Sequence, residues 1–123
     1  DTPYISQKGI GVDYLDFYHF LEGLINYSKW PDLIDYKTKH RRLKENGSVW
    51  TDSNKIFAAF DRLFHKFKDS ILVVSYRADG IPSIDELTIL LKKYKTVVEE
   101  VKRKSYKYVL STNHSEEVLL IGK

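Results

Sequence analysis

The 123-residue sequence contains no cysteine, which excludes a disulfide framework, a cysteine-based zinc cluster and a cysteine nucleophile. It also contains no methionine. Because a natural reading frame begins with methionine, we expect the chain to be a piece of a longer protein. The sequence has no apolar run of about 18 residues, the length that a membrane span needs. It does not begin with the pattern of a signal peptide, so a cytoplasmic protein without a membrane partner is expected.

Neither sign of charge dominates. The sequence has 20 Lys and Arg against 17 Asp and Glu, a net charge of +3. Such a mild excess permits binding to nucleic acid but does not argue for it, so evidence for such binding has to come from local clusters of charge. Hydrophobic residues make up 42% and charged residues 30%, as expected for one globular domain over residues 1–123.

Apolar residues recur at helical spacing in the first half of the chain. The pattern predicts a helix over about 13–27, with Asp13 as a candidate cap, and a short helix around Pro31. The segment "TDSNKIFAAFDRLFHKF" predicts a strongly amphipathic helix, capped by its Asp and Ser, whose aromatic stripe at 57–67 lies in the core. Residues 1–11 are interpreted as a loop, and residues 37–48 as an exposed basic loop.

The second half of the chain alternates between strand and helix patterns. "SILVVSY" at 70–76 predicts a strand buried on both faces. "SIDE" at 83–86 is a capping box that opens a helix reaching about Tyr94. "TVVEEVKR", "YKYVLST" and "EEVLLIGK" predict two or three closing strands. A strand–helix–strand unit implies a parallel pair, while closing strands this near in sequence pair antiparallel, so the predicted fold is α/β with a small mixed sheet of three or four strands.

Several short motifs, taken in order, resemble a known enzyme family. They are "DTPY" at 1–4, "YHFLEGL" at 18–24, "SILVVSYRADGIPS" at 70–83, and "YKYVLS" followed by "EEVLLIG" near the end. In order and spacing they resemble the C-terminal half of adenine-specific DNA methyltransferases of the restriction-modification type. The resemblance implies part of a Rossmann-like methyltransferase fold, with the cofactor-binding half missing.

The resemblance assigns catalysis to Asp1, Thr2, Pro3 and Tyr4, which match the family's Asp-Pro-Pro-aromatic motif. The amino nitrogen of adenine is a poor nucleophile because its lone pair is delocalised into the ring. A carboxylate (Asp1) and a backbone carbonyl (Thr2) that accept its two N–H bonds would draw it towards tetrahedral geometry. Tyr4 would stack on the base after it is flipped out of the duplex. Thr2 replaces the family's first Pro, which keeps the carbonyl and loses the rigid ring.

The same resemblance implies S-adenosylmethionine as methyl donor and double-stranded DNA as partner of the full-length parent. The family's glycine-rich cofactor loop is missing, since none of the 6 glycines lies in a strand, glycine-rich turn and helix. We therefore expect the fragment alone to bind no cofactor and to be inactive. We also expect it to self-associate, because strand 71–76 would lack a neighbour.

Two basic stretches are candidates for contact with DNA. The first, "KTKHRRLKE", carries five cations with acids only at its edges: Lys37, Lys39, Arg41, Arg42 and Lys44. It could contact phosphates or be a solvated surface. The second, "KRKSYKY", interleaves cations with Tyr106 and Tyr108, which could stack on a base or form the buried face of a strand. The histidines show no metal-ligand spacing, so we assign no metal.

Two functions from other classes remain open at this point. One is a non-catalytic basic module that binds nucleic acid. The other is an interaction domain that docks on a partner through the phenylalanine-rich helix.

Overall fold

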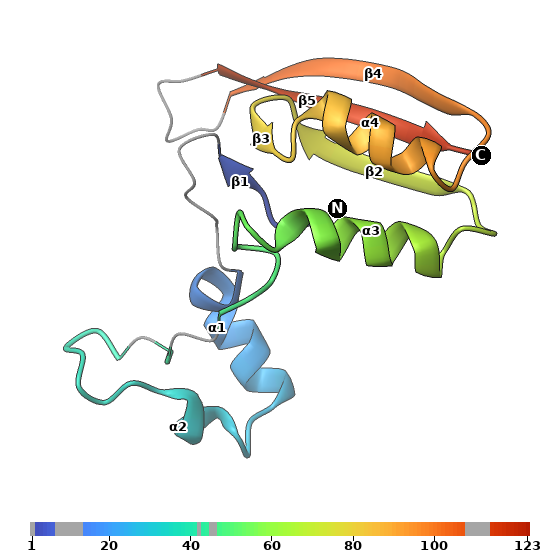
Figure 1. Cartoon of the computed structure of the whole chain (residues 1–123). Coiled ribbons are helices and arrows are strands. Elements are labelled where there is room, and N and C mark those ends of the chain that lie inside the picture. The colour runs from blue at the N-terminus through green and yellow to red at the C-terminus, as the bar shows by residue number, and fades with distance from the viewer. Residues whose placement is uncertain (1, 7–13, 42, 45–46, 108–113) are drawn as a thin grey trace.

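The computed structural model describes residues 2–6, 14–41, 43–44, 47–107 and 114–123, without the side chains of 14–17, 102–104, 106–107 and 114–115. The fold is α/β, as the sequence predicted (Figure 1). In chain order its elements are β1 (Ile5–Ser6), α1 (Tyr14–Ile25), α2 (Trp30–Leu33), α3 (Ile56–Lys66), β2 (Leu72–Arg77), β3 (Gly80–Ile81), α4 (Ile84–Lys92), β4 (Val98–Lys107) and β5 (His114–Gly122).

The larger sheet has three strands in the order β2-β5-β4. β5 runs antiparallel to both of its neighbours, so the closing strands pair as predicted. The predicted parallel pair across the strand–helix–strand unit is wrong. β2 and β4 do run in the same direction, but β5 lies between them and takes the hydrogen bonds of both. Local antiparallel pairing of β4 with the next strand in sequence therefore separates the two parallel strands.

The hydrophobic core lies between one face of this sheet and the helices α3 and α4 (Figure 1). Its buried members come from β1, α3, β2, α4 and β5: Ile5, Ile56, Phe60, Phe64, Val74, Tyr76, Ile84, Leu87, Leu90, Leu91, Val118 and Leu120. In the register of the sheet, Val74 is opposite Leu120 and Tyr76 is opposite Val118. The core side of the sheet thus consists of alternate residues of β2 and β5.

The other face of β2 is open in the described part of the chain. Val73 is 56% exposed, although Val74 beside it is only 8% exposed. The prediction that this strand is buried on both faces is therefore wrong for the residues described. The unbroken apolar run does not distinguish the two faces. Strand side chains point to opposite faces, and the described helices cover only one of them.

Helix α3 confirms the amphipathic prediction, but with differences in detail. Phe60 and Phe64 are buried, whereas Phe57 and Phe67, also assigned to the core, are 39% and 41% exposed. The predicted side-chain cap is not formed, and Lys55 occupies the cap position. The Asp52 carboxylate instead accepts a hydrogen bond from the Asn54 N–H (2.9 Å) in the turn before the helix.

The capping box of α4 is present as predicted. The Ser83 hydroxyl accepts a hydrogen bond from the Glu86 N–H (3.3 Å), and the Glu86 carboxylate accepts one from the Ser83 N–H (2.8 Å). Two N–H groups that the helix leaves unpaired are satisfied in this way. The motif therefore fixes where the chain leaves β3 and enters α4.

The helices α1 and α2 and the loop after them form an arm, residues 14–44, which lies apart from the sheet in Figure 1. The predicted helix forms, but Leu21 and Leu24 on its apolar face are 54% and 53% exposed. A Cβ atom at Gly23 would collide with the Trp30 ring, so the indole occupies the space that a larger side chain would need. Leu43 is buried and pairs with Ile34, which closes the basic loop.

Among the described residues, no helix is both long and apolar enough to cross a membrane.

Burial of Tyr76 makes a prediction about stability in alkali. Its ring is 0% exposed, and burial raises the pKa of its hydroxyl from 10.0 to about 12. The folded chain thus holds this proton more tightly than the unfolded chain. The stabilisation is complete below about pH 10 and is lost as pH rises towards 12, a change of about 2–3 kcal/mol.

We expect the Tyr76→Phe variant, which has no phenol to ionise here, to lose less stability between about pH 9 and about pH 11 than the wild type does. Urea unfolding at about pH 9 and about pH 11 measures the difference. Tyr27→Phe, at a tyrosine that is 71% exposed, is the matched control. Equal losses in Tyr76→Phe and wild type would contradict the prediction.

Candidate active site

The "DTPY" motif is fixed to the body of the fold by the residue that follows it. Ile5 is fully buried and pairs with Ile81, and Ser6 pairs with Gly80, so β1 and β3 form a second, two-stranded sheet. The interpretation of residues 1–11 as a loop is wrong for Ile5 and Ser6, because two residues are too few to show the period of a strand. Asp1 lies outside the described residues, while Thr2, Pro3 and Tyr4 are within them.

The pairing places Tyr4 at the carboxyl end of β2. The rings of Tyr4 and Tyr76 meet edge to face, with centroids 5.3 Å apart and planes at 84°. The Tyr76 hydroxyl donates a hydrogen bond to the Ile81 carbonyl (2.5 Å), which ties β2 to the β3 strand. Tyr76 therefore contacts the motif with its ring and holds the strand to which the motif is paired.

A carboxylate from β5 completes this arrangement. The Glu117 Oε1 atom accepts a hydrogen bond from the Ser75 hydroxyl at 2.6 Å and one from the Tyr4 hydroxyl at 3.3 Å. Sequence reasoning gave Glu117 no role. Its only signal was a pair of acidic residues before an apolar run, and such a pair is typical of a strand end on the surface.

The turn between β2 and β3 is held by its own ion pair. The Arg77 guanidinium donates two hydrogen bonds to the Asp79 carboxylate, at 2.7 and 2.6 Å. A Cβ atom at Gly80 would lie 2.5 Å from the Tyr76 ring, so glycine is required for this close approach. Tyr4, in contact with Tyr76, lies beside the carboxyl end of β2.

The structure places the first basic stretch at the tip of the arm. Lys37, Lys39, Arg41 and Lys44 are all exposed, and Arg42 lies outside the described residues. Two of these cations have local partners. The Arg41 Nη1 atom donates to the Tyr36 carbonyl (2.7 Å), with its guanidinium carbon 5.1 Å from the centre of the Tyr36 ring. The Lys44 ammonium donates to the Asp32 carbonyl (2.7 Å).

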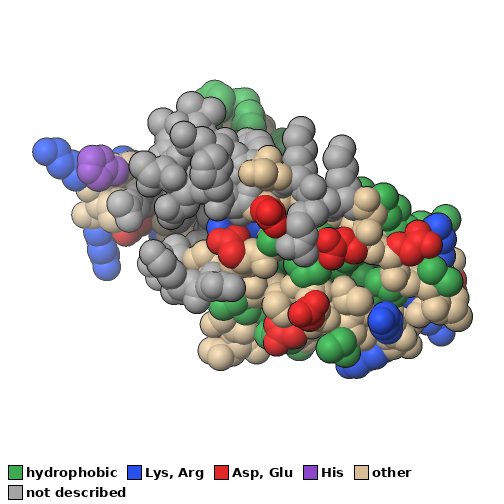
Figure 2. Space-filling view, turned by 90° about the horizontal axis from the view of Figure 1, so that it is seen from above, with side chains coloured by type: hydrophobic (Ala, Val, Ile, Leu, Met, Phe, Trp, Pro, Cys, Tyr) green, Lys and Arg blue, Asp and Glu red, His purple; other side chains and the backbone are tan. Residues whose placement is uncertain are grey.

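Basic residues cluster at the tip of the arm. Figure 2 shows basic and histidine side chains at its left end, where residues 37–41 project in Figure 1, while both acidic and basic side chains are visible over the rest of that face. The exposed acids of β4 and β5 are Glu99, Glu100, Glu116 and Glu117. Of the second basic stretch, Tyr106 lies in β4 opposite Ser115 and its side chain is not described, while Tyr108 is outside the described residues.

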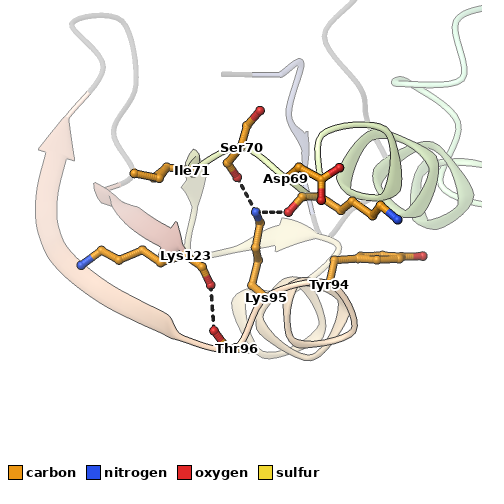
Figure 3. Close-up of a pocket in the computed structure, with 8 residues that line it drawn as sticks. Asp69, Ser70, Ile71, Tyr94, Lys95, Thr96 and Lys123 are labelled. Atoms are coloured by element: carbon orange, nitrogen blue, oxygen red, sulfur yellow. Dashed lines mark hydrogen bonds between the residues drawn. The ribbon is translucent and has the colours of Figure 1, made fainter.

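A hollow of about 310 Å³ lies at the other end of β2, away from Tyr4 (Figure 3). Lys95 reaches into it and is only 8% exposed. Its ammonium group donates hydrogen bonds to the backbone carbonyls of Lys68 and Ser70, in the turn between α3 and β2. Lys95 thus joins the end of α4 to that turn, and its two carbonyl partners account for its burial.

Two curated proteins match most of this chain. Modification methylase LlaI of Lactococcus lactis subsp. lactis is 31% identical over 116 residues, which are 94% of this chain and 18% of that protein. Type II methyltransferase M.FokI of Planomicrobium okeanokoites is 29% identical over 94 residues, which are 76% of this chain and 14% of that protein. No model of a protein family and no solved structure matches.

The chain thus spans less than a fifth of the length of these relatives. A match over 94% of the chain includes the central elements α3, β2 and α4. It confirms the resemblance that the motifs indicated. The chain is a homologue of a segment of the type II modification methylases, the methyltransferases of restriction-modification systems.

Proposed function

We propose that this chain is the target-base side of a site-specific DNA adenine methyltransferase. The parent enzyme would transfer a methyl group from S-adenosylmethionine to the amino group of a flipped adenine. One observation carries the proposal: β1 and Tyr76 hold Tyr4 of the "DTPY" motif at the carboxyl end of β2, in a chain whose homologues are modification methylases. A motif that was only a surface turn would not need a buried residue directly behind it.

The residues of the motif have distinct roles in this proposal. The Asp1 carboxylate and the Thr2 carbonyl accept the two N–H bonds of the adenine amino group, which makes its nitrogen a better nucleophile. Acceptors that are in place before the reaction would stabilise the charge that develops on the nitrogen in the transition state. Tyr4 provides a ring on which the flipped base stacks.

The described residues do not fit S-adenosylmethionine. Among the described glycines, Gly80 alone lies in the segment from β2 to α4, and one glycine does not make a glycine-rich turn. The first turn of the helix that follows carries Asp85 and Glu86, and the Glu86 N–H is already bonded to Ser83. We therefore assign the cofactor to another part of the parent enzyme.

We assign DNA backbone contact to the tip of the arm. Lys37 and Lys39 are exposed cations there, and exposed cations suit contact with phosphates. In this assignment the motif contacts the target base and the arm contacts the phosphate backbone.

The first test concerns Asp1 in a full-length methyltransferase that contains this chain. Asp1→Ala should lower turnover about 100- to 1000-fold, the usual cost of removing one preorganised transition-state partner. DNA affinity should change little, because the interaction forms mainly in the transition state. Tyr4→Ala should weaken base flipping as well as turnover, since it removes a stacking surface.

Single-turnover methylation and DNA binding measure the two effects. Asp69→Ala, which removes an exposed carboxylate at the far end of β2, is the control and should behave as wild type. Near-normal turnover of Asp1→Ala would refute the catalytic role of the motif.

A second test concerns the arm. The double variant Lys37→Gln and Lys39→Gln should weaken DNA binding about equally on all sequences. The slope of log affinity against log salt should fall by about 0.9 for each phosphate that the arm no longer neutralises. Lys66→Gln with Lys68→Gln, at the end of α3, is the charge-matched control. A slope equal to that of the control would show that the arm is only solvated.

A third test concerns self-association of the isolated chain. The side of β2 that faces away from β5 has no strand partner among the described residues, and Val73 beside it is exposed. Unpaired strand edges with apolar neighbours invite pairing with a second copy. We expect dimers or larger species by light scattering, reduced in Val73→Lys but not in Ile89→Lys, where a 66% exposed residue of α4 is changed. A wild-type chain that stays monomeric at high concentration would contradict this.

A further inference from the structure

The Glu117 carboxylate links three segments that are far apart in the sequence. Its Oε1 atom accepts hydrogen bonds from Ser75 in β2 and from Tyr4, which precedes β1. Ser75 and Glu117 lie diagonally on neighbouring strands, since Leu119 is opposite Ser75 and Arg77 is opposite Glu117. The sheet therefore brings this carboxylate to the motif, and no local sequence feature could do so.

The two hydrogen bonds differ in strength. The Ser75 bond, at 2.6 Å, has the length of a charge-assisted O–H···O⁻ bond and gives the carboxylate a fixed place. The Tyr4 bond, at 3.3 Å, is longer than the usual length of about 2.7–2.8 Å and is therefore the weaker of the two. Hydrogen bonds of this kind are often long in the free enzyme and shorten when substrate binds.

The orientation of the Tyr4 ring depends on two contacts. The edge-to-face contact with Tyr76 restricts rotation of the ring plane, and the bond to Glu117 holds the hydroxyl at the far end of the ring. A ring that stacks on a base must present its face in one plane. The contact at its hydroxyl therefore adds a restraint on the ring that the contact with Tyr76 does not supply.

We propose that Glu117, held in place by Ser75, is a positioning residue that sets the Tyr4 ring for stacking on the flipped base. The inference rests on the proposed function, because it gives Tyr4 a base to stack on. Glu117 itself does not touch the reacting atoms in this assignment. It acts through the Tyr4 hydroxyl.

The experiment uses a full-length methyltransferase that contains this chain, with a duplex carrying 2-aminopurine at the target adenine. Fluorescence of 2-aminopurine reports flipping and stacking, and single-turnover methylation of the normal duplex reports the rate. We compare Glu117→Ala, Glu117→Gln, Tyr4→Phe and the double variant Glu117→Ala with Tyr4→Phe. Glu116→Ala is the matched control, because its side chain leaves the opposite face of β5.

Glu117→Ala and Tyr4→Phe should each reduce the flipping signal and the rate by a similar factor, about 3- to 10-fold, or about 0.7–1.4 kcal/mol. The double variant should be no worse than either single one, because both changes remove the same interaction. Glu117→Gln keeps an acceptor and should retain most of the signal. Glu116→Ala should match the wild type.

Two results would overturn the inference. One is a wild-type signal in Glu117→Ala while Tyr4→Ala impairs flipping in the same enzyme. The other is an effect of Glu117→Ala that persists undiminished in the Tyr4→Phe background, which would mean that Glu117 acts on the fold. If Tyr4→Ala and Asp1→Ala both keep the wild-type flipping signal and methylation rate, the proposed function fails and the inference fails with it.

Discussion

The buried ring of Tyr76 is the contact on which both the core and the candidate site depend. It meets Phe60 of α3 and Tyr4 of the motif, each edge to face, with centroids 5.6 and 5.3 Å away. Its hydroxyl satisfies the Ile81 carbonyl, so a polar atom at the edge of the core has its partner. Tyr76 thus packs against both helix α3 and Tyr4, although these segments are far apart in the sequence.

The rest of the site follows from this contact. β3 is held by the Tyr76 hydroxyl, β1 pairs with β3, and Ile5 is buried in the same core, so Thr2–Tyr4 have little freedom relative to the sheet. A site built on strand ends in this way is more rigid than one carried by a loop alone. For a base that must be held during attack on a methyl group, such rigidity is useful, because small displacements of reacting groups slow the reaction greatly.

The open face of β2 and the arm both expose apolar side chains. Val73 and Leu24 carry apolar surface that the described residues do not cover. The chain corresponds to less than a fifth of the length of the relatives it matches. An unbroken apolar run in the sequence therefore does not show that a strand of this segment is covered on both faces.

The sequence by itself determined the elements whose signal is local. The capping box at Ser83 and the period of α3 depend on residues within one or two turns, and both formed as predicted. The antiparallel closing strands were also predictable, because short connections favour local pairing. The motif order indicated the family, which the match to the modification methylases confirmed.

Only the tertiary structure decided what depends on distant pairs. β5 separates β2 from β4, Ile5 pairs with Ile81, and Glu117 reaches Tyr4 across 113 positions of sequence. Periodicity cannot report such contacts, since the pattern of one strand shows which residues share a face and not which strand lies beside it. The choice of neighbour is made by the packing of the whole core, and that choice put a carboxylate beside the candidate catalytic tyrosine.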